Sequence, residues 1–388
     1  MTHAVRDQLV PGFAALALAG GDAFAAEWSA TPALGSYAEY TSNPRLSTLD
    51  AAESATGLVG DASLLLAWRD PVVEASLRPR FVLREYRGDD GLDASDVYVD
   101  GIFRRTFERG NLQFTAGYAD DSTLTGDPAA GGFAGRSVPR ETIEASLAAA
   151  RQTSERGQFG VRLQYDDVSY DQGLRSGLLD YRYLSGLAYH QHTVDARTSV
   201  RVIGRAARLY VPLTDRETNE YSVGLGLDRQ WNAVWRSSIA AGPEFSRIED
   251  GPTENGFSYR ADLTGVMPRS TWQIEASRVL SPVASRGQLE TRNALTFSAD
   301  FRVRERLGVS TLLSLSQFED PDVPGRPDRD FEDRRYGTAA LGIAWQASEQ
   351  CTWRAGYTYL VADEIERAED HRITLGASCG VRPWTASR

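Results

Sequence analysis

The chain has 388 residues with 42 basic and 53 acidic side chains, a formal net charge of −11, and no lysine among its basic residues. This acidic balance excludes the concentrated basic face of a nucleic-acid-binding protein. A mean hydropathy of −0.37, with no run of about eighteen apolar residues, excludes a bundle of membrane helices, and two cysteines are too few for a disulfide-rich scaffold.

The first residues have the layout of a secretory signal peptide. A positively charged start at residues 1–6 precedes a short apolar stretch at 9–19, and Ala23-Phe24-Ala25 matches an A-x-A cleavage site. The sequence therefore predicts a leader, residues 1–25, and a mature chain, residues 26–388, that forms one domain. A frayed soluble N-terminus is the alternative interpretation.

From about residue 30 onward, apolar and polar residues alternate with the two-residue period of a strand that has two different faces. In residues 72–86 one face carries Val73, Ala75, Leu77, Phe81 and Leu83, and the other carries Glu74, Ser76, Arg78, Arg80 and Arg84. The pattern recurs at 96–108, 158–166 and 289–303. A soluble sandwich also alternates, but its modules end after about a hundred residues. The uninterrupted pattern favours a transmembrane β-barrel.

Short and long polar connections take turns along the chain, as in an outer-membrane barrel with tight periplasmic turns and longer external loops. The short connections are predicted at 69–71, 108–110, 153–157, 190–193, 230–233, 267–270, 303–306 and 347–350. The longest of the others are 120–139 and 319–335. Counting both sets predicts an all-β, antiparallel up-and-down barrel of about 18 strands with both termini periplasmic.

The aromatic residues divide between the two ends of these strands. Tyrosines gather toward the long loops, with Tyr189 as the main exception, whereas tryptophans lie beside the short turns or the termini. Amphipathic rings favour membrane–water interfaces. The sequence therefore predicts an interface girdle, with Trp28 and Trp384 near the termini and Trp68, Trp231, Trp235, Trp272, Trp345 and Trp353 at the turns.

The opening Tyr37-Ala38-Glu39-Tyr40-Thr41-Ser42-Asn43-Pro44-Arg45-Leu46 resembles the first strand of outer-membrane barrels found with exopolysaccharide-synthesis genes, the β-barrel porin 2 group. Residues 120–125 and 165–170 are similar to stretches of the same group. The resemblance implies a pore through which a polymer leaves the cell. One departure is that the chain ends after Trp384 with Thr385-Ala386-Ser387-Arg388 and not on an aromatic residue.

If the apolar face meets lipid, the charged face lines a lumen wide enough for water in a barrel of roughly sixteen to eighteen strands. The predicted lumen arginines are Arg78, Arg80, Arg84, Arg104, Arg162, Arg182, Arg197, Arg201, Arg205, Arg236, Arg260, Arg292, Arg302, Arg354 and Arg372. The predicted lumen acids are Glu74, Asp100, Asp166, Asp180, Asp195, Glu220, Asp228, Glu244, Asp262, Glu275, Glu290 and Asp300. The arginines could select anionic sugars, or they could pair with the acids and brace the wall.

Three arginines on one predicted strand, Arg197, Arg201 and Arg205, share a face with few acids between them. The hypothesis is that they form a basic track for polyanions. Cys351 and Cys379 are placed opposite each other when the last two strands fold back around a turn near Ile365, which predicts a cross-strand disulfide. Two free, lipid-facing thiols are the alternative.

The sequence offers little for catalysis. Of four histidines, His3 lies in the leader, His190 and His192 in a predicted turn, and His371 near a loop, and no nucleophile elbow or phosphate loop occurs. The acidic stretch 319–333 could bind calcium, although an exposed loop is the simpler interpretation. We expect no enzyme activity, no cofactor and no metal.

These observations predict a channel in the outer membrane of a Gram-negative-type envelope, a passive conduit linked to exopolysaccharide export. A general diffusion porin for small solutes is the close alternative, and a barrel plugged by loops such as 120–139 or 319–335 is the structural one. The expected partners are outer-membrane lipid and either polysaccharide or small polar solutes.

Overall fold

The computed structural model describes residues 26–47, 51–88, 90–123, 137–171, 177–248, 253–283, 287–319, 334–363, 367–381 and 384–387. The expected leader, residues 1–25, lies outside the described residues, as do most of the predicted connections 120–139 and 319–335. Within the described part of the chain, no helix is long and apolar enough to cross a membrane.

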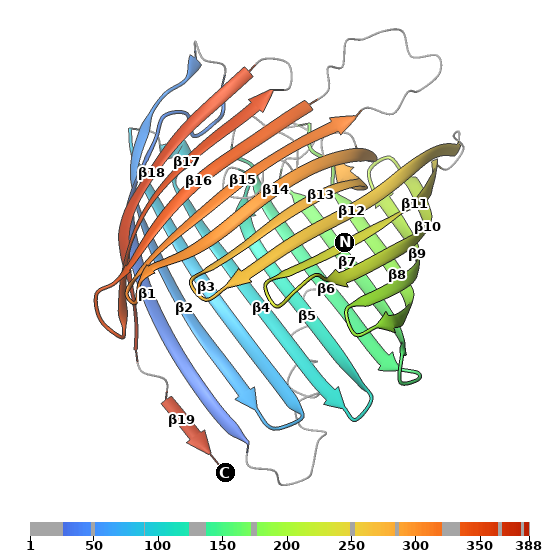
Figure 1. Ribbon diagram of the computed structural model, residues 1–388. Helices are drawn as coiled ribbons and strands as arrows, with labels where there is room; N and C mark the ends of the chain where they lie inside the picture. The colour runs from blue at the N-terminus through green and yellow to red at the C-terminus, as the bar shows by residue number, and fades with distance from the viewer. Residues whose placement is uncertain are drawn as a thin grey trace.

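Eighteen long antiparallel strands form the body of the molecule (Figure 1). They are β1 (Glu27–Thr41), β2 (Ala55–Arg69), β3 (Val73–Arg87), β4 (Ala94–Phe107), β5 (Gly110–Ser122), β6 (Pro139–Gln152), β7 (Gly157–Tyr170), β8 (Tyr181–Asp195), β9 (Thr198–Val211), β10 (Arg216–Gln230), β11 (Trp235–Ile248), β12 (Thr253–Met267), β13 (Ser270–Val283), β14 (Gln288–Arg304), β15 (Leu307–Glu319), β16 (Arg334–Gln346), β17 (Cys351–Asp363) and β18 (Arg367–Gly380). A 3-10 turn, η2 (Asp90–Leu92), precedes β4, and a short β19 (Trp384–Ser387) follows β18.

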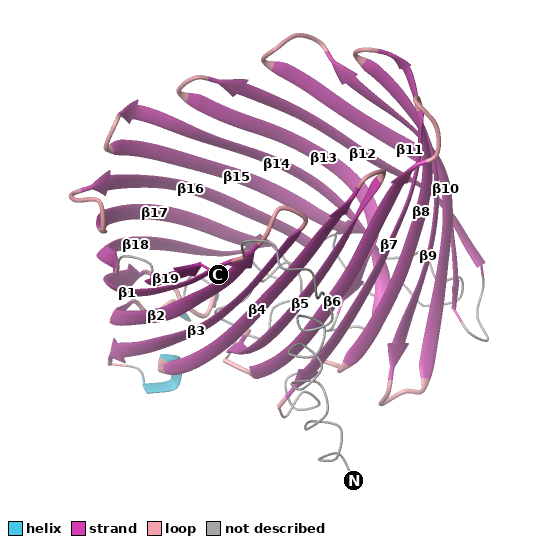
Figure 2. Cartoon of the chain, turned by 90° about the horizontal axis from the view of Figure 1, so that it is seen from below, coloured by secondary structure: helices cyan, strands magenta, loops and turns pink. Residues whose placement is uncertain are grey.

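Each long strand pairs with its neighbours in sequence, and the sheet closes where β1 pairs with β18. The closing register runs from Ala33 opposite Gly380 to Thr41 opposite Arg372. After β18, the short β19 also runs antiparallel to β1 and pairs with residues 27–30, farther along the same edge. Closure pairs the backbone groups that an open edge would leave unsatisfied in lipid. The structure thus confirms the closed up-and-down barrel predicted from the sequence; Figure 2 shows the strands encircling a common axis.

The two faces of the sheet differ sharply. Large apolar side chains stand exposed on the outer face, among them Leu34, Leu225 and Leu315, which are 67%, 70% and 60% exposed. Most of the alternate residues on the same strands, such as Gly35 of β1 and Ser314 of β15, are small or polar and face the lumen. The strands are 13 to 17 residues long, whereas a tilted transmembrane strand needs only about 9–11 residues. Their ends therefore extend beyond the hydrocarbon layer.

Connections at one end of the barrel, here called the short-turn end, are tight and stabilised by their own side chains. Asp70 accepts hydrogen bonds from the backbone N–H groups of Val72 and Val73 at 2.8 and 2.7 Å. Asn232 does the same for the backbone N–H groups of Val234 and Trp235 at the start of β11. Such Asx turns let a polar side chain replace a backbone partner. The opposite end, the long-loop end, carries the longer connections.

One predicted turn is wrong. Residues 190–193 continue β8, which pairs with β9 as far as Asp195, and the turn lies at 196–197. His190 and His192 are therefore strand residues and not turn residues. The physical reason is the Asp195 carboxylate, which accepts the backbone N–H of Arg197 at 2.7 Å and so fixes the turn later in the chain.

Candidate functional site

The lumen wall is the candidate site, because it collects most of the charged side chains of the strands. Residues that lie opposite each other in neighbouring strands share a face, so the register fixes which arginines face inward. Those of the predicted set on the inner face are Arg78, Arg80, Arg84, Arg104, Arg162, Arg201, Arg205, Arg236, Arg260, Arg292, Arg302, Arg354 and Arg372. Arg197 lies in the turn between β8 and β9.

Arg182 is an exception to the predicted face. It lies opposite Asp167 and Tyr210 on the outer face and forms an ion pair with Asp167 at 3.2 Å. The buried Tyr183 takes the inward position instead. Asp180 precedes the strand and accepts the backbone N–H of Tyr170. The prediction placed Arg182 on the wrong face. The connection before β8 separates it from β7, and alternation within one strand does not determine which of its faces points inward after such a connection.

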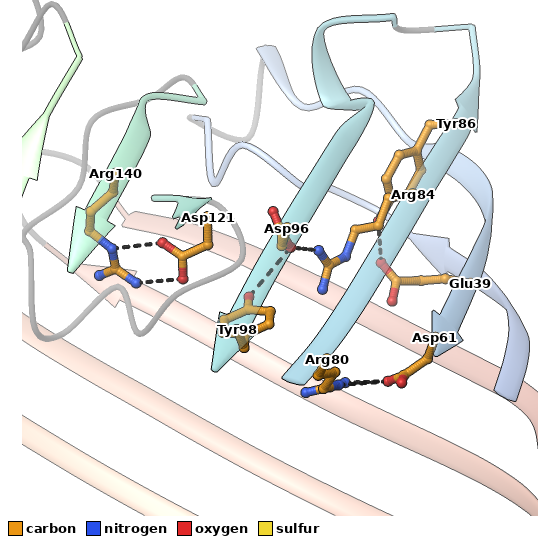
Figure 3. Close-up of polar contacts among 9 residues, drawn as sticks. All are labelled: Glu39, Asp61, Arg80, Arg84, Tyr86, Asp96, Tyr98, Asp121 and Arg140. Carbon is orange, nitrogen blue, oxygen red and sulfur yellow. Dashed lines mark hydrogen bonds and ion pairs between the residues drawn. The ribbon is translucent and has the colours of Figure 1, made fainter. Parts of the chain in front are cut away.

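Ion pairs brace the wall from β1 to β6 (Figure 3). The Nε of Arg80 donates to Asp61 at 2.8 Å, and Arg84 pairs with the buried Asp96. Toward the long-loop end the hydroxyl of Tyr86 donates to Glu39 at 2.6 Å. The guanidinium of Arg140 binds Asp121 through two hydrogen bonds, 2.9 and 2.8 Å long. Bidentate pairs of this kind are the strongest charge-assisted contacts and hold neighbouring strands in register.

Sequence reasoning missed several members of this ladder. Asp121 falls inside the connection predicted at 120–139 and Arg140 directly follows it, yet the two residues lie opposite each other in the β5–β6 pairing. Glu39 and Asp61 lie on strands without the long charged alternation seen in β3. The signal that could have found them is their shared face with small residues: Glu39 lies on the same face of β1 as Gly35, and Asp61 lies opposite Gly35.

Two members of the predicted track, Arg201 and Arg205, are neutralised by acids of β10, and the third, Arg197, lies in the turn before β9. Arg201 pairs with Asp228 at 2.8 Å, and Arg205 pairs with the buried Glu220 at 2.9 Å. The structure therefore gives β9 no row of free cations. Arg104 and Arg260 are also paired, with Glu74 and Glu275. The two partners in each of these contacts lie on adjacent strands, as the bracing interpretation requires.

Seven of the predicted lumen arginines make no ion pair among the described residues. They are Arg78, Arg162, Arg197, Arg236, Arg292, Arg302 and Arg354. Arg292 packs its guanidinium 5.7 Å from the ring centre of Phe318. Arg78 lies opposite Asp100 in register without pairing to it. Free cations are thus present in the wall, but Arg201 and Arg205 of the predicted track are not among them.

Along the part of the inner wall that the structure describes, three hollows stand out. The first, about 830 Å³, lies at the short-turn end of β12 to β18 and includes Arg302 and Arg354. The second, about 540 Å³, lies between β1–β3 and β17–β18 and includes Arg78 and Arg354. The third, about 430 Å³, lies at the short-turn end of β8 to β12 and includes Arg236. The first two share Arg354 and Thr374, so they form one continuous stretch of wall.

The interior of the long-loop end is filled by apolar clusters. Leu46, from the β1–β2 connection, packs with Val283 and Phe318 of β13 and β15, which lie several strands away around the sheet. At the opposite side, Leu289 of β14 packs with Leu209 of β9. Leu46 holds a left-handed backbone with φ of 47°, a conformation that costs free energy unless the surroundings fix it. The packed contacts supply that constraint and narrow the mouth.

A buried carboxylate anchors the β1–β2 connection. Asp370 of β18 has no exposed surface and accepts hydrogen bonds from the Thr41 hydroxyl at 2.7 Å and the Asn43 backbone N–H at 2.9 Å. Ser42 donates to the same oxygen at 3.3 Å. The side chain of Asn43 in turn accepts the backbone N–H of Ser47. These contacts hold the connection against the inner wall where Leu46 enters the mouth.

The cysteines and tryptophans occupy the outer face at the short-turn end. Cys351 lies opposite Cys379 with Cα atoms 4.1 Å apart, and a disulfide joins them. Trp28 stacks on Trp68 with ring centres 6.0 Å apart, and Trp235 meets Trp272 edge-on at 4.4 Å. The structure also places these tryptophans at the short-turn end: Trp231, which precedes β11, and Trp345 and Trp353, which pair across β16 and β17.

The described residues hold no group of three or more His, Cys, Asp or Glu side chains arranged for a metal ion. His371 lies on the outer face, where the Tyr357 hydroxyl contacts its Nδ1 at 2.8 Å and Tyr359 lies against its ring. Most of the acidic stretch 319–333, considered above for calcium, falls outside the described residues.

No family model matches the sequence, and a search of curated proteins found no match. Solved structures with similar folds include OpdO of Pseudomonas aeruginosa, with a TM-score of 0.49, 9% identity, and coverage of 91% of this chain and 97% of that one. OccK2 (OpdF) of the same species has a TM-score of 0.47 and 11% identity, and the match covers 93% of this chain and 100% of that one. OccAB1 of Acinetobacter baumannii has a TM-score of 0.46 and 8% identity, and the match covers 92% of this chain and 97% of that one.

At these identities and TM-scores the likeness assigns neither a family nor a function. The architecture rests on the chain's own strand pairing and on the apolar outer face. A closed antiparallel barrel of this size, with an apolar outer face and a polar interior, is the architecture of outer-membrane proteins. The protein is an outer-membrane β-barrel of a Gram-negative-type envelope.

Proposed function

We propose that the protein is a passive diffusion channel for small polar solutes. The observation that carries the proposal is the lumen wall of the closed barrel, which is polar and retains three hollows. Side chains that brace the wall pair with the neighbouring strand, as Arg80 of β3 does with Asp61 of β2. The proposal includes no catalytic step and no cofactor.

The filled mouth favours small solutes over a polymer. Leu46 and Leu289 pack inside the long-loop end against strands far from their own, so the described loops cross part of the opening. A polysaccharide would need this end to widen, whereas a small solute needs only a side passage. Gly287, with φ of 59°, brings the β13–β14 connection against Leu179, and even one added methyl there would meet it at 2.8 Å.

Exopolysaccharide export is the second candidate, supported by the resemblance of residues 37–46 to the first strand of the β-barrel porin 2 group. Secretion of polymer by a strain that lacks the gene separates the two. Loss of secreted polymer with normal uptake of small solutes would favour export, and unchanged secretion would favour diffusion.

Single-channel recording tests the proposal itself. We expect refolded protein in planar bilayers to produce discrete, long-lived conductance steps, because a barrel of eighteen strands encloses a water-filled space unless it is plugged. A barrel plugged by its loops would insert but stay silent. Insertion is verified in the same samples by protease protection, so that silence is not mistaken for failed refolding.

A further inference from the structure

We propose that Arg354, together with Arg302 and Arg78, forms an anion-binding wall that selects small solutes bearing a carboxylate or phosphate group. This inference rests on the proposed channel function and names its substrate class. The three arginines come from β17, β14 and β3, and all three lack an ion pair among the described residues.

Arg354 stands on a patch of wall where its register neighbours are small. Its neighbours in register are Ala344 on β16 and Gly376 on β18. The next inner positions are Gly342 and Gly356, which lie opposite each other. The guanidinium therefore projects from a floor of small residues into the region where the first and second hollows meet.

The charges around these hollows do not balance. The first hollow contains four arginines and two acids. The second also contains four arginines and two acids, Glu39 and Asp61, and both acids are already occupied by Tyr86 and Arg80. This positive wall belongs to a chain whose net charge is −11. By contrast, the third hollow holds three arginines and three acids.

Guanidinium chemistry determines the class of ligand. The planar fork presents parallel N–H donors that match the two oxygens of a carboxylate or phosphate. Because Arg354, Arg302 and Arg78 are exposed to solvent, each contact is weak. A series of weak sites suits permeation, since a solute must bind well enough to enter and loosely enough to leave.

Reversal potentials in a KCl gradient, and block of the chloride current by glutarate or by inorganic phosphate, test the proposal. We expect an anion-selective wild type and, in Arg354→Gln, a loss of anion selectivity with block weakened about fivefold, the effect of removing one unit charge at contact distance in water. Arg354→Lys should keep the selectivity but bind glutarate less well, since it lacks the planar fork.

Arg236→Gln is the matched control. Arg236 also faces the lumen without an ion pair among the described residues, but it lies in the charge-balanced third hollow. We expect a smaller shift in this variant. Open channels with equal shifts in Arg354→Gln and Arg236→Gln, or with none, would overturn the anion site and leave the channel standing. A silent wild type would overturn both. Block by glutarate alone or by phosphate alone identifies which anion the wall prefers.

Discussion

Leu313→Arg should lower the free energy of unfolding from a bilayer by about 2–4 kcal/mol, the cost of an arginine on the lipid face near the midplane of a barrel. Leu313 lies at the centre of β15, is 51% exposed, and shares the outer face with Phe297 and Ala339. The effect is measured by urea titration of protein folded into vesicles.

The adjacent Leu312 provides the control. It has the same side chain and nearly the same depth, but it shares the inner face with Ser298 and Ala340. Leu312→Arg places its guanidinium in the watery lumen. The free energy of unfolding of this variant should therefore change by less than about 1 kcal/mol, the small cost that an arginine has where water can reach it. Equal losses in the two variants would mean that the two faces of β15 do not meet different solvents.

Asp370→Ala should release the β1–β2 connection and open the mouth of the channel. A hydrogen bond to a charged group contributes about 1.5–3 kcal/mol, and the donors left behind at Thr41 and Asn43 are buried. We therefore expect a loss of at least about 2 kcal/mol in the free energy of unfolding. We also expect a larger or noisier single-channel conductance, because Leu46 loses its anchor.

Glu369→Ala is the matched change on the opposite face of β18. Glu369 pairs with the exposed Arg367 on the outer face, where an ion pair contributes little. Its stability and conductance should stay close to those of the wild type. If Asp370→Ala behaves in the same way, the β1–β2 connection does not narrow the mouth.

The architecture could be predicted from the sequence because apolar and polar residues must alternate along a strand of a membrane barrel. The charged face of β3, with Arg78 and Arg80, could be assigned without knowing any neighbour. Connection lengths then gave the strand count, since a polar stretch between two alternating segments leaves few other interpretations. The error at 190–193 arose where polar residues such as Gln191 and Thr193 continue the inner face of a strand and look like a turn.

The site was harder to predict, because its chemistry depends on contacts between strands. Arg201 and Arg205 looked like free cations until the register placed Asp228 and Glu220 of β10 within reach. Arg354 stands free because Ala344 and Gly376 flank it. Which arginine is paired depends on the register between neighbouring strands, and a single sequence does not specify that register. Alternation therefore predicts the faces of the barrel but not its charge pattern.

Closure of the barrel between its first and last long strands is the claim on which the rest depends. In a variant without native cysteines, Ser36→Cys and Ala377→Cys would place two thiols opposite each other on β1 and β18. The control pair is Ile343→Cys and Ala355→Cys, opposite each other on the consecutive strands β16 and β17. After mild oxidation in vesicles, mass analysis should find a disulfide in both. A control pair that cross-links while the two thiols on β1 and β18 stay reduced would show an open sheet, and it would contradict the barrel.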